Sequence, residues 1–414
     1  MKKLVGNAIV GQSGGPTAAI NATLAGVISG ALASPCVNTV YGMRNGIEGM
    51  LNERFVELNA IFEDADKLDA LKHTPSAALG SCRKKLPNPD SEKDTDIAVF
   101  ERIFEIFEKY DIRYFFYIGG NDSMDTVAKI SKYAEKKSYE IRVMGVPKTI
   151  DNDLVATDHT PGFGSAAKYV ATTLTEIVRD CAVYTTKAVT IVEVMGRDAG
   201  WLTTAAGVGA FIGIDAPDLV YLPERDFSME AFFCDLEKAF EKHPNIVVAV
   251  SEGIRFADGR YVGEGTQTGS TDVFGHKYLA GTAKALELAV KDKFGCKVRS
   301  VELNLPQRCA SHIASKTDLD ESVAIGAEAV RLAAEEGVSA EMVLFERLSN
   351  EPYEYAVSHK PVRDIANMVK KVPDEYINAE GNYITKACAD YVLPLIEGES
   401  APKFYKGIPQ YIVL

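Results

Sequence analysis

The sequence predicts an α/β fold of the doubly wound type, in which helices cover both faces of a parallel sheet. Short runs rich in β-branched or aromatic residues each end in a glycine or polar turn, and most of those turns lead into a segment with helical periodicity. The runs are also almost continuously apolar, which is typical of strands that are buried on both faces. The five predicted strands are residues 7–10, 112–118, 141–146, 188–194 and 246–250.

Three segments have the 3.6-residue period of helices. The first has an apolar stripe over residues 100–107, with Thr95 as its expected N-cap. A second helix is expected to follow Ser123, and an alanine-rich third is expected over residues 320–336. The polar, glycine-rich residues 257–271 are expected to form a loop.

Composition narrows the class of protein. The chain has 414 residues, enough for two or three domains, and 46% of them are hydrophobic. A net charge of −13 without a basic run argues against nucleic-acid binding. No segment approaches membrane-spanning length, and the short apolar stretch after Lys3 does not predict a signal peptide. Seven cysteines without a Cys-x-x-Cys pair favour reduced thiols, so we expect a cytoplasmic protein.

Three turns that follow predicted strands carry candidate chemistry. The first, GQSGGPTAAIN at residues 11–21, has Gly14 and Gly15 where backbone N–H groups could approach an anion at the start of a helix. An ordinary tight turn explains that motif about equally well. The second, YIGGNDSMDT at residues 117–126, follows two glycines with the carboxylate of Asp122. A negative side chain is unexpected in a turn that otherwise suits phosphate.

The third turn, PKTIDND at residues 147–153, brings Lys148, Thr149, Asp151 and Asp153 to the end of one strand. Ligands of open α/β sheets bind at the carboxyl ends of strands. Two carboxylates spaced i, i+2 can share a role, with one accepting a proton and the other orienting a partner. A solvated Asx turn would use the same residues. The lysine beside the carboxylates shifts the balance towards a site for phosphate.

Two further segments supply arginines. VEVMGRDAGW ends a predicted strand with Met195, Gly196 and Arg197. VELNLPQRC carries Arg308, with Arg299 just upstream. Arginine is suited to phosphate because its guanidinium forms two parallel hydrogen bonds to phosphate oxygens. Each arginine alone would be read as a solvated surface charge, but the order and types of all five segments together are specific.

From Gly11 to about Arg308 the chain resembles the phosphofructokinase family. The segments SGGP…IN, GGNDS, PKTIDND and VEVMGR carry the resemblance. SEG at residues 251–253 and PQR at residues 306–308 support it. It implies two doubly wound, Rossmann-like α/β domains with the active site in the cleft between them. It also implies phosphoryl transfer to the 1-hydroxyl of fructose 6-phosphate. The expected domains are a donor-binding domain at 1–160 with 309–342 crossing back, a sugar-phosphate domain at 161–308, and a C-terminal extension or cap at 343–414.

The resemblance assigns the chemistry mainly to the PKTIDND turn. Asp151 would be the base that accepts the proton of the sugar hydroxyl. Thr149 would contact the sugar or the transferring phosphoryl group, and Asp153 would hold the geometry of the site. Lys148 and Arg197 would compensate charge. Because phosphoryl transfer passes through a loose transition state, placement and charge compensation would supply most of the acceleration.

The same resemblance places the sugar phosphate against the later strands. Residues 195–197 would hold the substrate near the scissile bond, and Glu252 would accept hydrogen bonds from sugar hydroxyls. Arg299 and Arg308 would clamp the 6-phosphate, since arginine binds phosphate oxygens in a bidentate way. Leu305 stands where many relatives have a histidine, so the resemblance supplies no such contact here.

The donor phosphates would lie against the earlier turns. Mg²⁺ is implied, because donor phosphates carry more negative charge than the protein groups balance alone. Asn121 stands where many relatives have aspartate, so Asp122 would be the main metal carboxylate and Asn121 a neutral ligand. The residues that would line the donor are Gly15, Arg83, Gly120, Asp122, Ser123 and Lys148.

Asp122 and Lys148 would decide which donor is used. Family members that use ATP resemble Gly-Gly-Asp-Gly and Pro-Gly-Thr-Ile-Asp, whereas those that use pyrophosphate resemble Gly-Gly-Asp-Asp and Pro-Lys-Thr-Ile-Asp. A carboxylate at 122 would occupy the space where the α-phosphate of a nucleotide continues, and Lys148 would supply a cation to the shorter donor. The resemblance therefore implies a reversible, pyrophosphate-dependent enzyme. The alternatives are an ATP-dependent enzyme of the same fold and a non-catalytic regulatory subunit.

The expected partners are small molecules, fructose 6-phosphate and pyrophosphate, with no nucleic acid and no membrane. Sedoheptulose 7-phosphate could also fit a cleft that holds phosphate through arginines. By resemblance the protein would be a homodimer or homotetramer. Many relatives reach across the subunit boundary with an arginine where this chain has Ala188, so that contact is not carried over.

Overall fold

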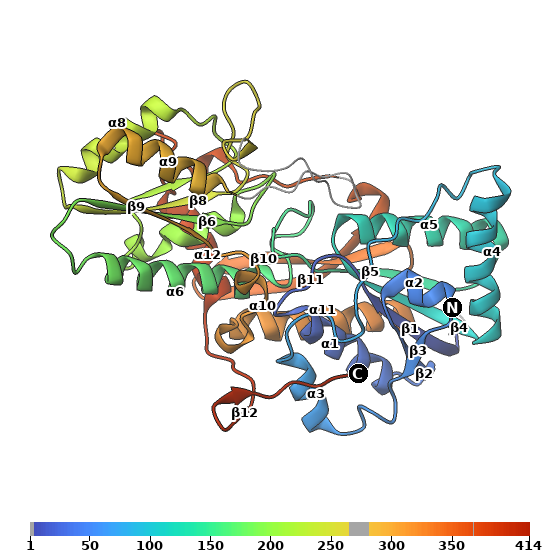
Figure 1. The fold of residues 1–414 in the computed structure, drawn as a ribbon. Coiled ribbons are helices and arrows are strands. Elements are labelled where there is room, and N and C mark those ends of the chain that lie inside the picture. The colour runs from blue at the N-terminus through green and yellow to red at the C-terminus, as the bar shows by residue number, and fades with distance from the viewer. Residues whose placement is uncertain (1–3, 265–280, 367) are drawn as a thin grey trace.

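The computed structural model describes residues 4–264, 281–366 and 368–414, and its ribbon divides into two lobes, each built on its own sheet (Figure 1). The strands of the larger sheet are, in chain order, β1 (Gly6–Gln12), β2 (Val37–Met43), β3 (Phe55–Glu57), β4 (Ile112–Gly119), β5 (Arg142–Pro147), β10 (Glu341–Asn350) and β11 (Tyr353–Pro361). Their order across the sheet is β11-β10-β5-β4-β1-β2-β3. The inner strands are parallel, whereas β3 and β11 pair antiparallel at the two edges.

The strands of the smaller sheet are β6 (Ala188–Val194), β7 (Leu219–Tyr221), β8 (Asn245–Ser251) and β9 (Lys297–Glu302), in the order β7-β8-β6-β9. All of their pairings are parallel. A short hairpin, β12 (Phe404–Tyr405) and β13 (Ile408–Pro409), lies near the C-terminus. The helices are α1 (Ile20–Ala33), α2 (Gly46–Leu51), α3 (Ala65–Lys72), α4 (Asp94–Lys109), α5 (Asn121–Lys137), α6 (Phe163–Cys181), α7 (Trp201–Thr204), α8 (Met229–Phe240), α9 (Thr282–Phe294), α10 (Pro306–Cys309), α11 (Lys316–Arg331) and α12 (Lys386–Val392).

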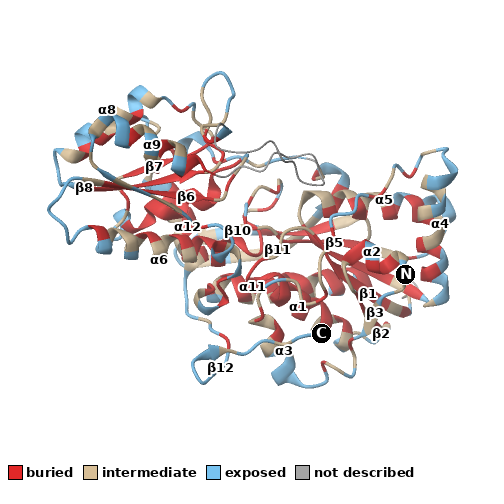
Figure 2. Ribbon diagram, viewed as in Figure 1, coloured by how far each residue is buried: buried red, intermediate tan, exposed pale blue. Residues whose placement is uncertain are grey.

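Helices cover both faces of the larger sheet, because successive side chains of a buried strand point to opposite sides. On β4, Tyr114 and Phe116 pack in one core with residues of α1 and α11, whereas Phe115 and Tyr117 pack in another with residues of α4 and α5. Figure 2 shows the inner strands of both sheets, β1, β4, β5, β6 and β8, as mainly buried. Helices α1 and α11 touch at Gly326, where a side chain would collide with the backbone of α1.

The smaller sheet is also covered on both faces. On β8, Val248 and Val250 share a core with residues of α8 and α9, while Val247 and Ala249 share a core with residues of α6 and α12. The doubly wound α/β prediction is therefore confirmed for both lobes. All five predicted strands are present, each with ends within two residues of those predicted.

The predicted helices need smaller corrections. Thr95 does not cap α4: the helix begins at Asp94 with Lys93 at its N-cap, which places two acidic residues in the first turn, where the helix dipole favours them. Helix α11 begins earlier than predicted because the Ser315 hydroxyl accepts a hydrogen bond from the backbone of Asp318. Of the loop predicted at 257–271, residues 257–264 are irregular and the rest lie outside the described residues.

The C-terminal chain returns to both lobes. Residue 343, where the C-terminal extension or cap is expected to begin, lies inside β10, and β10 and β11 are part of the larger sheet. Helix α12 then packs in the core of the smaller lobe. The chain ends back on the larger lobe, where Arg44 Nη1 donates to the carbonyl oxygen of Leu414 at 2.8 Å. The division of the chain into donor, sugar and cap domains stays a prediction. Among the described helices, none combines the length and apolar composition of a membrane span.

Candidate active site

The three turns singled out in the sequence meet at one edge of the larger sheet. They follow β1, β4 and β5, which are adjacent and parallel, so their carboxyl ends lie together. Two backbone hydrogen bonds tie the turns to one another. Ser13 N donates to Ile118 O at 2.9 Å, and Lys148 N donates to Gly119 O at 3.0 Å. This is the edge at which open α/β sheets bind ligands.

Lys148 is the buried cation of this edge, with 2% of the residue exposed. Its Nζ donates to the carbonyl oxygen of Gly15 at 2.6 Å. The pKa of Lys148 is lowered to about 8, mainly by burial; the charge of Asp151 opposes this effect, and the charges of Arg308 and Arg83 add to it. Three positive side chains therefore surround the first glycine turn, as an anion site requires.

The backbone of that turn lies close to two of these cations. Gly14 has a φ of 78°, a left-handed conformation that glycine adopts without strain. A Cβ atom on Gly14 would lie 3.3 Å from Lys148 Nζ, and one on Gly15 would lie 3.6 Å from Arg308 Nη1. The absence of side chains on Gly14 and Gly15 thus lets the backbone of the turn lie close to both cations.

Asp151 lies on the next turn with its carboxylate held by its neighbour. Thr149 Oγ1 accepts from Asp151 N at 3.1 Å and donates to Asp151 Oδ2 at 3.3 Å. The carboxylate is reachable by solvent but is surrounded by protein, and this burial raises its pKa. Burial and the charge of Asp151 raise the pKa of Asp153 to about 7. Asp198, which sequence reasoning did not single out, raises the pKa of both carboxyl groups.

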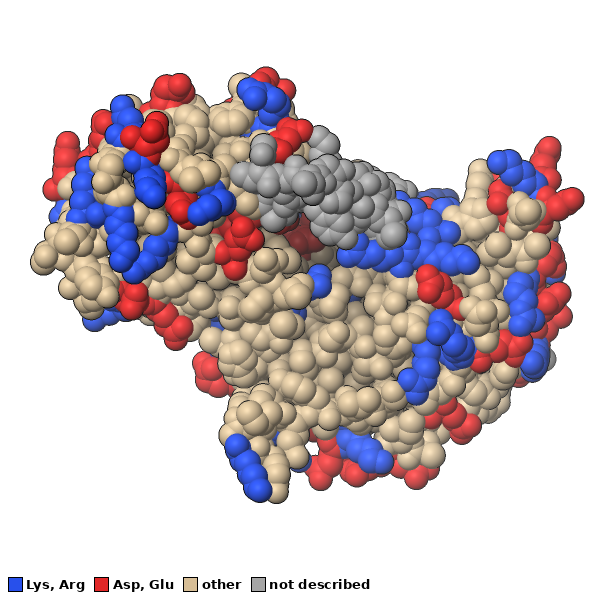
Figure 3. Space-filling view, viewed as in Figure 1, with Lys and Arg blue, Asp and Glu red and all other residues tan. Residues whose placement is uncertain are grey.

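Arg197 faces this cluster from the smaller lobe. Its charge lowers the pKa of Asp151 and of Glu252, so it lies near both carboxylates. Its Nε is buried and has no hydrogen-bond partner among the described residues. Because buried polar groups in proteins are normally paired, this donor is available to an anionic ligand. Lys148, Asp151 and Arg197 are thus brought together from two lobes, and Figure 3 shows the surface hollowed between those lobes.

Three segments of the smaller lobe hold Arg197 in place. Met195 N donates to Gln307 Oε1 at 3.1 Å, which joins the VEVMGR turn to the PQR segment. Gly196 N donates to Glu252 Oε1 at 3.3 Å, and the Ser251 hydroxyl donates to Gly196 O. Burial raises the pKa of Glu252 to about 7. The VEVMGR, SEG and PQR motifs therefore form one hydrogen-bonded unit.

Within one chain, Arg299 does not lie beside the hydrogen-bonded unit formed by the VEVMGR, SEG and PQR motifs. It lies on the edge strand β9, with its Cα paired to that of Thr190, and lines a groove of about 280 Å³ against α6. The five residue steps from Thr190 on β6 to Met195, just past the end of that strand, span about 16 Å. Parallel register therefore places Arg299 towards the far end of the strand within one chain, and the expectation that Arg299 and Arg308 clamp one phosphate stays a prediction.

The start of α5 holds the candidate metal ligands. Asp122 lies in the first turn, and its Oδ1 is 3.0 Å from Lys85 Nζ. The Oδ1 atom of Asn121 is buried and lacks a partner among the described residues. No cluster of three His, Cys, Asp or Glu side chains suited to a metal occurs in the described chain. One carboxylate and one free amide oxygen fit a hard cation that takes its remaining ligands from substrate phosphate and water.

The other residues predicted for the donor lie beside these groups. Gly120 is the N-cap of α5, and Ser123, which follows in the first turn, is 2% exposed. A side chain on Gly119 would collide with Ser123, so the two residues fix how the strand enters the helix. The positive charge of Arg83 lowers the pKa of Lys148 and Arg308, which places Arg83 at the same edge.

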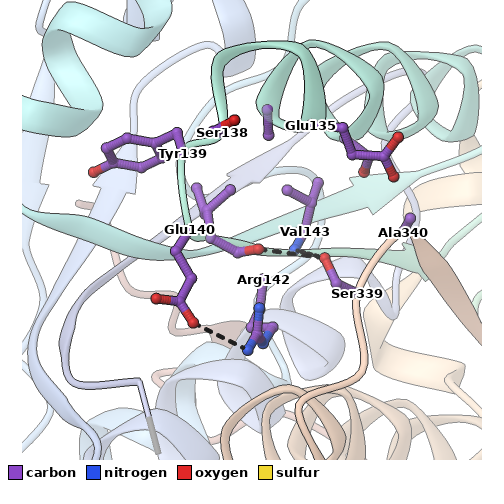
Figure 4. A pocket seen from close by; sticks show the side chains of 11 residues that line it. Glu135, Ser138, Tyr139, Glu140, Arg142, Val143, Ser339 and Ala340 are labelled. Atoms are coloured by element: carbon purple, nitrogen blue, oxygen red, sulfur yellow. Dashed lines mark hydrogen bonds and ion pairs between the residues drawn. The ribbon is translucent and has the colours of Figure 1, made fainter. Parts of the chain in front are cut away.

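A separate pocket of about 300 Å³ lies at the amino ends of β5 and β10, at the opposite edge of the sheet. Figure 4 shows the ion pair between Arg142 and Glu140 there, and the hydrogen bond from Val143 N to Ser339 Oγ at 3.0 Å. None of the predicted site residues lines it. The chemistry-bearing residues are concentrated at the carboxyl edge instead.

Comparison with known proteins agrees with the geometry. The family model described as phosphofructokinase matches residues 7–333. Pyrophosphate–fructose 6-phosphate 1-phosphotransferase of Methylococcus capsulatus is 42% identical over 99% of this chain and 96% of its own length. The enzyme of the same name from Halomonas elongata is 42% identical over 98% of this chain and 95% of its own. A solved pyrophosphate-dependent phosphofructokinase from Nitrosospira multiformis is 37% identical, covers 98% of this chain and 95% of its own, and has a TM-score of 0.87.

Proposed function

The chain belongs to the phosphofructokinase family, and from this premise we propose that it transfers a phosphoryl group from pyrophosphate to the 1-hydroxyl of fructose 6-phosphate, giving fructose 1,6-bisphosphate and phosphate. The observation that carries the proposal is the buried Lys148 at the glycine turn, with Asp151 and Arg197 beside it. The donor bond is the simple phosphoanhydride of pyrophosphate, and the bond formed is a phosphate ester of the sugar. We therefore propose that the reaction runs in either direction.

Asp151 is the base in this proposal. Its raised pKa makes it a better proton acceptor than an ordinary aspartate. The Thr149 hydroxyl orients the carboxylate through the hydrogen bond to Oδ2. The sugar hydroxyl gives up its proton to Asp151 as its oxygen bonds to phosphorus.

Lys148 and Arg197 compensate charge on either side of the transferring group. Lys148 Nζ stabilises the leaving phosphate at the Gly15 turn, and Arg197 Nε, which has no described partner, takes a phosphoryl oxygen. Preorganised cations of this kind act more strongly in a partly dry site than in water. Arg308 serves the sugar phosphate from the side next to Gly15.

We propose Mg²⁺ as the metal, held by Asp122 and by the free Asn121 oxygen together with the donor. A bound Mg²⁺ would neutralise charge on the donor oxygens. The ion pair between Asp122 and Lys85 occupies the start of α5, where a longer nucleotide donor would have to continue. This disfavours the ATP-dependent alternative, and the intact Thr149–Asp151 pair disfavours a non-catalytic subunit.

A coupled assay tests the reaction. Purified protein is mixed with fructose 6-phosphate, Mg²⁺ and pyrophosphate, and fructose 1,6-bisphosphate is read out through aldolase. The proposal expects product with pyrophosphate and, in the reverse direction, consumption of fructose 1,6-bisphosphate with phosphate. Absence of turnover in both directions, from protein that remains folded by circular dichroism, would contradict it.

The pH profile of kcat/KM is expected to be bell-shaped. Asp151 must be ionised, and burial raises its pKa above the ordinary value of an aspartate, so activity is lost on the acid side at a higher pH than an unperturbed aspartate would give. Lys148 must be charged, and its pKa of about 8 makes activity fall as the pH rises above that value. Initial rates between about pH 5 and pH 10 measure both limbs. A rate that is flat across that range contradicts these assignments.

We further propose a homo-oligomer in which Arg299 serves the site of a second copy. Two apolar residues after α6, Val183 and Tyr184, are 71% and 52% exposed. Ile212 and Ile214 are similarly exposed on a loop that Arg179 ties to α6 through Asp215. This apolar patch supports self-association near the groove that contains Arg299.

Complementation tests the shared site. Asp151→Asn chains and Arg299→Met chains are expected to be impaired separately but to regain activity with a wild-type KM for fructose 6-phosphate when co-expressed. The recovered sites would combine Asp151 of one chain with Arg299 of the other. If activity after co-expression equals the sum of the two separate variants, Arg299 does not act across a subunit boundary.

We also propose a cytoplasmic location, which the seven free cysteines support, since reduced thiols persist in that compartment.

A further inference from the structure

The chain segment 370–372, far from every sequence motif, lies between the turn that carries Asp151 and the turn that carries Arg197. Lys370 N donates to the carbonyl oxygen of Asp153 at 2.7 Å, which attaches the segment to the PKTIDND turn. On the other side, Trp201 Nε1 donates to the carbonyl oxygen of Lys370 at 2.9 Å. The segment therefore bonds to both halves of the site.

A carboxylate extends the second attachment. Glu224 Oε1 accepts from Val372 N at 3.1 Å and from Gly200 N at 3.0 Å. Gly200 lies three residues after Arg197 in the same turn. One oxygen atom thus fixes the segment to the chain that positions Arg197.

The side chain of Lys370 makes the contacts on the Asp151 side. Its Nζ donates to Asp158 O at 2.7 Å, to Thr157 O at 3.1 Å and to Asn152 Oδ1 at 3.4 Å. It also lies 5.0 Å from the centre of the Trp201 ring, as a cation–π contact requires. One ammonium group therefore joins three points of the loop after Asp151 to an aromatic ring of the other lobe.

Asn152 explains why those contacts matter for the neighbouring base. It has a φ of 52°, in the left-handed region, and it is fully buried. Its Nδ2 donates to Tyr391 Oη at 2.8 Å, and Tyr391 Oη donates to Asp158 O at 2.7 Å. Lys370 and Tyr391 thus hold both ends of the Asn152 amide. An asparagine in a left-handed conformation redirects the chain, so these bonds set where the preceding carboxylate points.

We propose that Lys370 is a positioning residue for phosphoryl transfer, which fixes Asp151 relative to Arg197 by bonding the loop after Asp151 to the Trp201 element of the other lobe. The inference rests on the proposed function. Reacting groups held in place by neighbours give large rate effects when displaced, because a shift of about 1 Å costs on the order of 100-fold in rate. Lys370 itself touches no reacting atom in this scheme.

The charge of Lys370 also affects the pKa of Asp153, so the pH dependence of the rate gives a second way to test the proposal. The charges of Asp151 and Asp198 raise the pKa of Asp153. Lys148 also interacts with Asp153, and the Lys370 ammonium lowers its pKa. Removing that ammonium leaves the two carboxylates and burial to raise the pKa further. The acid limb of the rate profile would then move to higher pH.

The test variant is Lys370→Met, which keeps the length of the apolar stem and removes the charge and the donors. We expect kcat to fall about 10- to 100-fold, with KM for both substrates within about threefold of wild type. The acid limb should move up by about one pH unit. Lys132→Met makes the same chemical change on α5, at a side chain that is 56% exposed, and should leave kcat and the limb unchanged.

Three comparisons separate positioning from simple destabilisation. Lys370→Arg restores the charge, so it should return the acid limb to the wild-type pH. In an Asp151→Asn background, Lys370→Met should cost little further activity, because the group that it positions is absent. Tyr391→Phe, which removes only a hydroxyl, should lower kcat without moving the limb, and it serves as the test if Lys370→Met does not fold.

Wild-type protein in the same assay separates the two proposals. If it does not turn over pyrophosphate, the proposed function fails. If wild-type protein turns over pyrophosphate and Lys370→Met has the same kcat and the same acid limb as wild type, the positioning role is overturned. An equal loss of kcat in Lys370→Met and Lys132→Met also overturns it. If Lys370→Met cannot be purified, an unchanged kcat in a folded Tyr391→Phe does the same.

Discussion

Replacing Asp151 with asparagine is expected to lower kcat by roughly 10²- to 10⁴-fold, the range that loss of a general base produces. Asparagine has the shape of aspartate and can still accept from Thr149 Oγ1, so the turn should keep its conformation. What it cannot do is take the proton of the sugar hydroxyl. The loss should therefore appear in kcat at saturating substrate, with KM for pyrophosphate unchanged or lower because one negative charge has gone.

Asp66→Asn is the matched control. Asp66 lies in the first turn of α3, and its side chain is 82% exposed. The same removal of one charge there should leave kcat within about twofold, since surface substitutions have small effects. Near-normal turnover by Asp151→Asn would show that Asp151 is not the base and would redirect attention to Asp153 and Asp198 beside it.

Lys148→Met is expected to lower kcat/KM for pyrophosphate by about 10²- to 10³-fold, the effect of removing one preorganised electrostatic contact. Both kcat and KM should change, because Lys148 meets the donor before the transition state as well as in it. Steady-state rates at varied pyrophosphate measure the two parameters separately.

The same variant should not be less stable, which sets it apart from an ordinary core mutation. Burial lowers the pKa of Lys148 from 10.5 to about 8, so charging it in the folded state costs about 3 kcal/mol. The cost is complete below pH 8 and disappears as the pH rises past 10.5. At neutral pH Lys148→Met removes it, and a thermal melt should show a Tm equal to or above that of wild type.

Lys132→Met serves as the control for charge, because Lys132 is 56% exposed and pairs only with Asp90 among the partners described for it. It should leave both kcat/KM and Tm close to wild type. If Lys148→Met were destabilised and yet bound pyrophosphate normally, the buried lysine would be a structural group rather than a ligand for the donor.

Much of this site could be predicted from sequence because the signals are local. Each strand is an apolar run bounded by a turn, and the turns that follow β1, β4 and β5 converge because adjacent parallel strands end at one edge. Lys148, Thr149 and Asp151 lie within four residues of one another, so their proximity required no knowledge of the fold.

The features that sequence missed depend on distant contacts. Lys370 and Tyr391 lie more than 200 residues from Asn152, in a stretch without clear periodicity, and only folding brings them to it. Asn152 itself carried a usable signal, since an asparagine between two acidic residues in a turn often adopts a left-handed conformation. The position of Arg299 along β9 follows from strand register, which the motif around it does not reveal.

The choice of donor is the central claim, and one competition experiment tests it most directly. Wild-type protein, fructose 6-phosphate and Mg²⁺ are mixed with equimolar pyrophosphate and ATP in one tube, and ³¹P NMR follows both donors. We expect the pyrophosphate resonance to disappear as phosphate and fructose 1,6-bisphosphate form, while the three ATP resonances persist. Formation of ADP with the pyrophosphate resonance unchanged would contradict the assignment of Lys148 and Asp122 as determinants of pyrophosphate use.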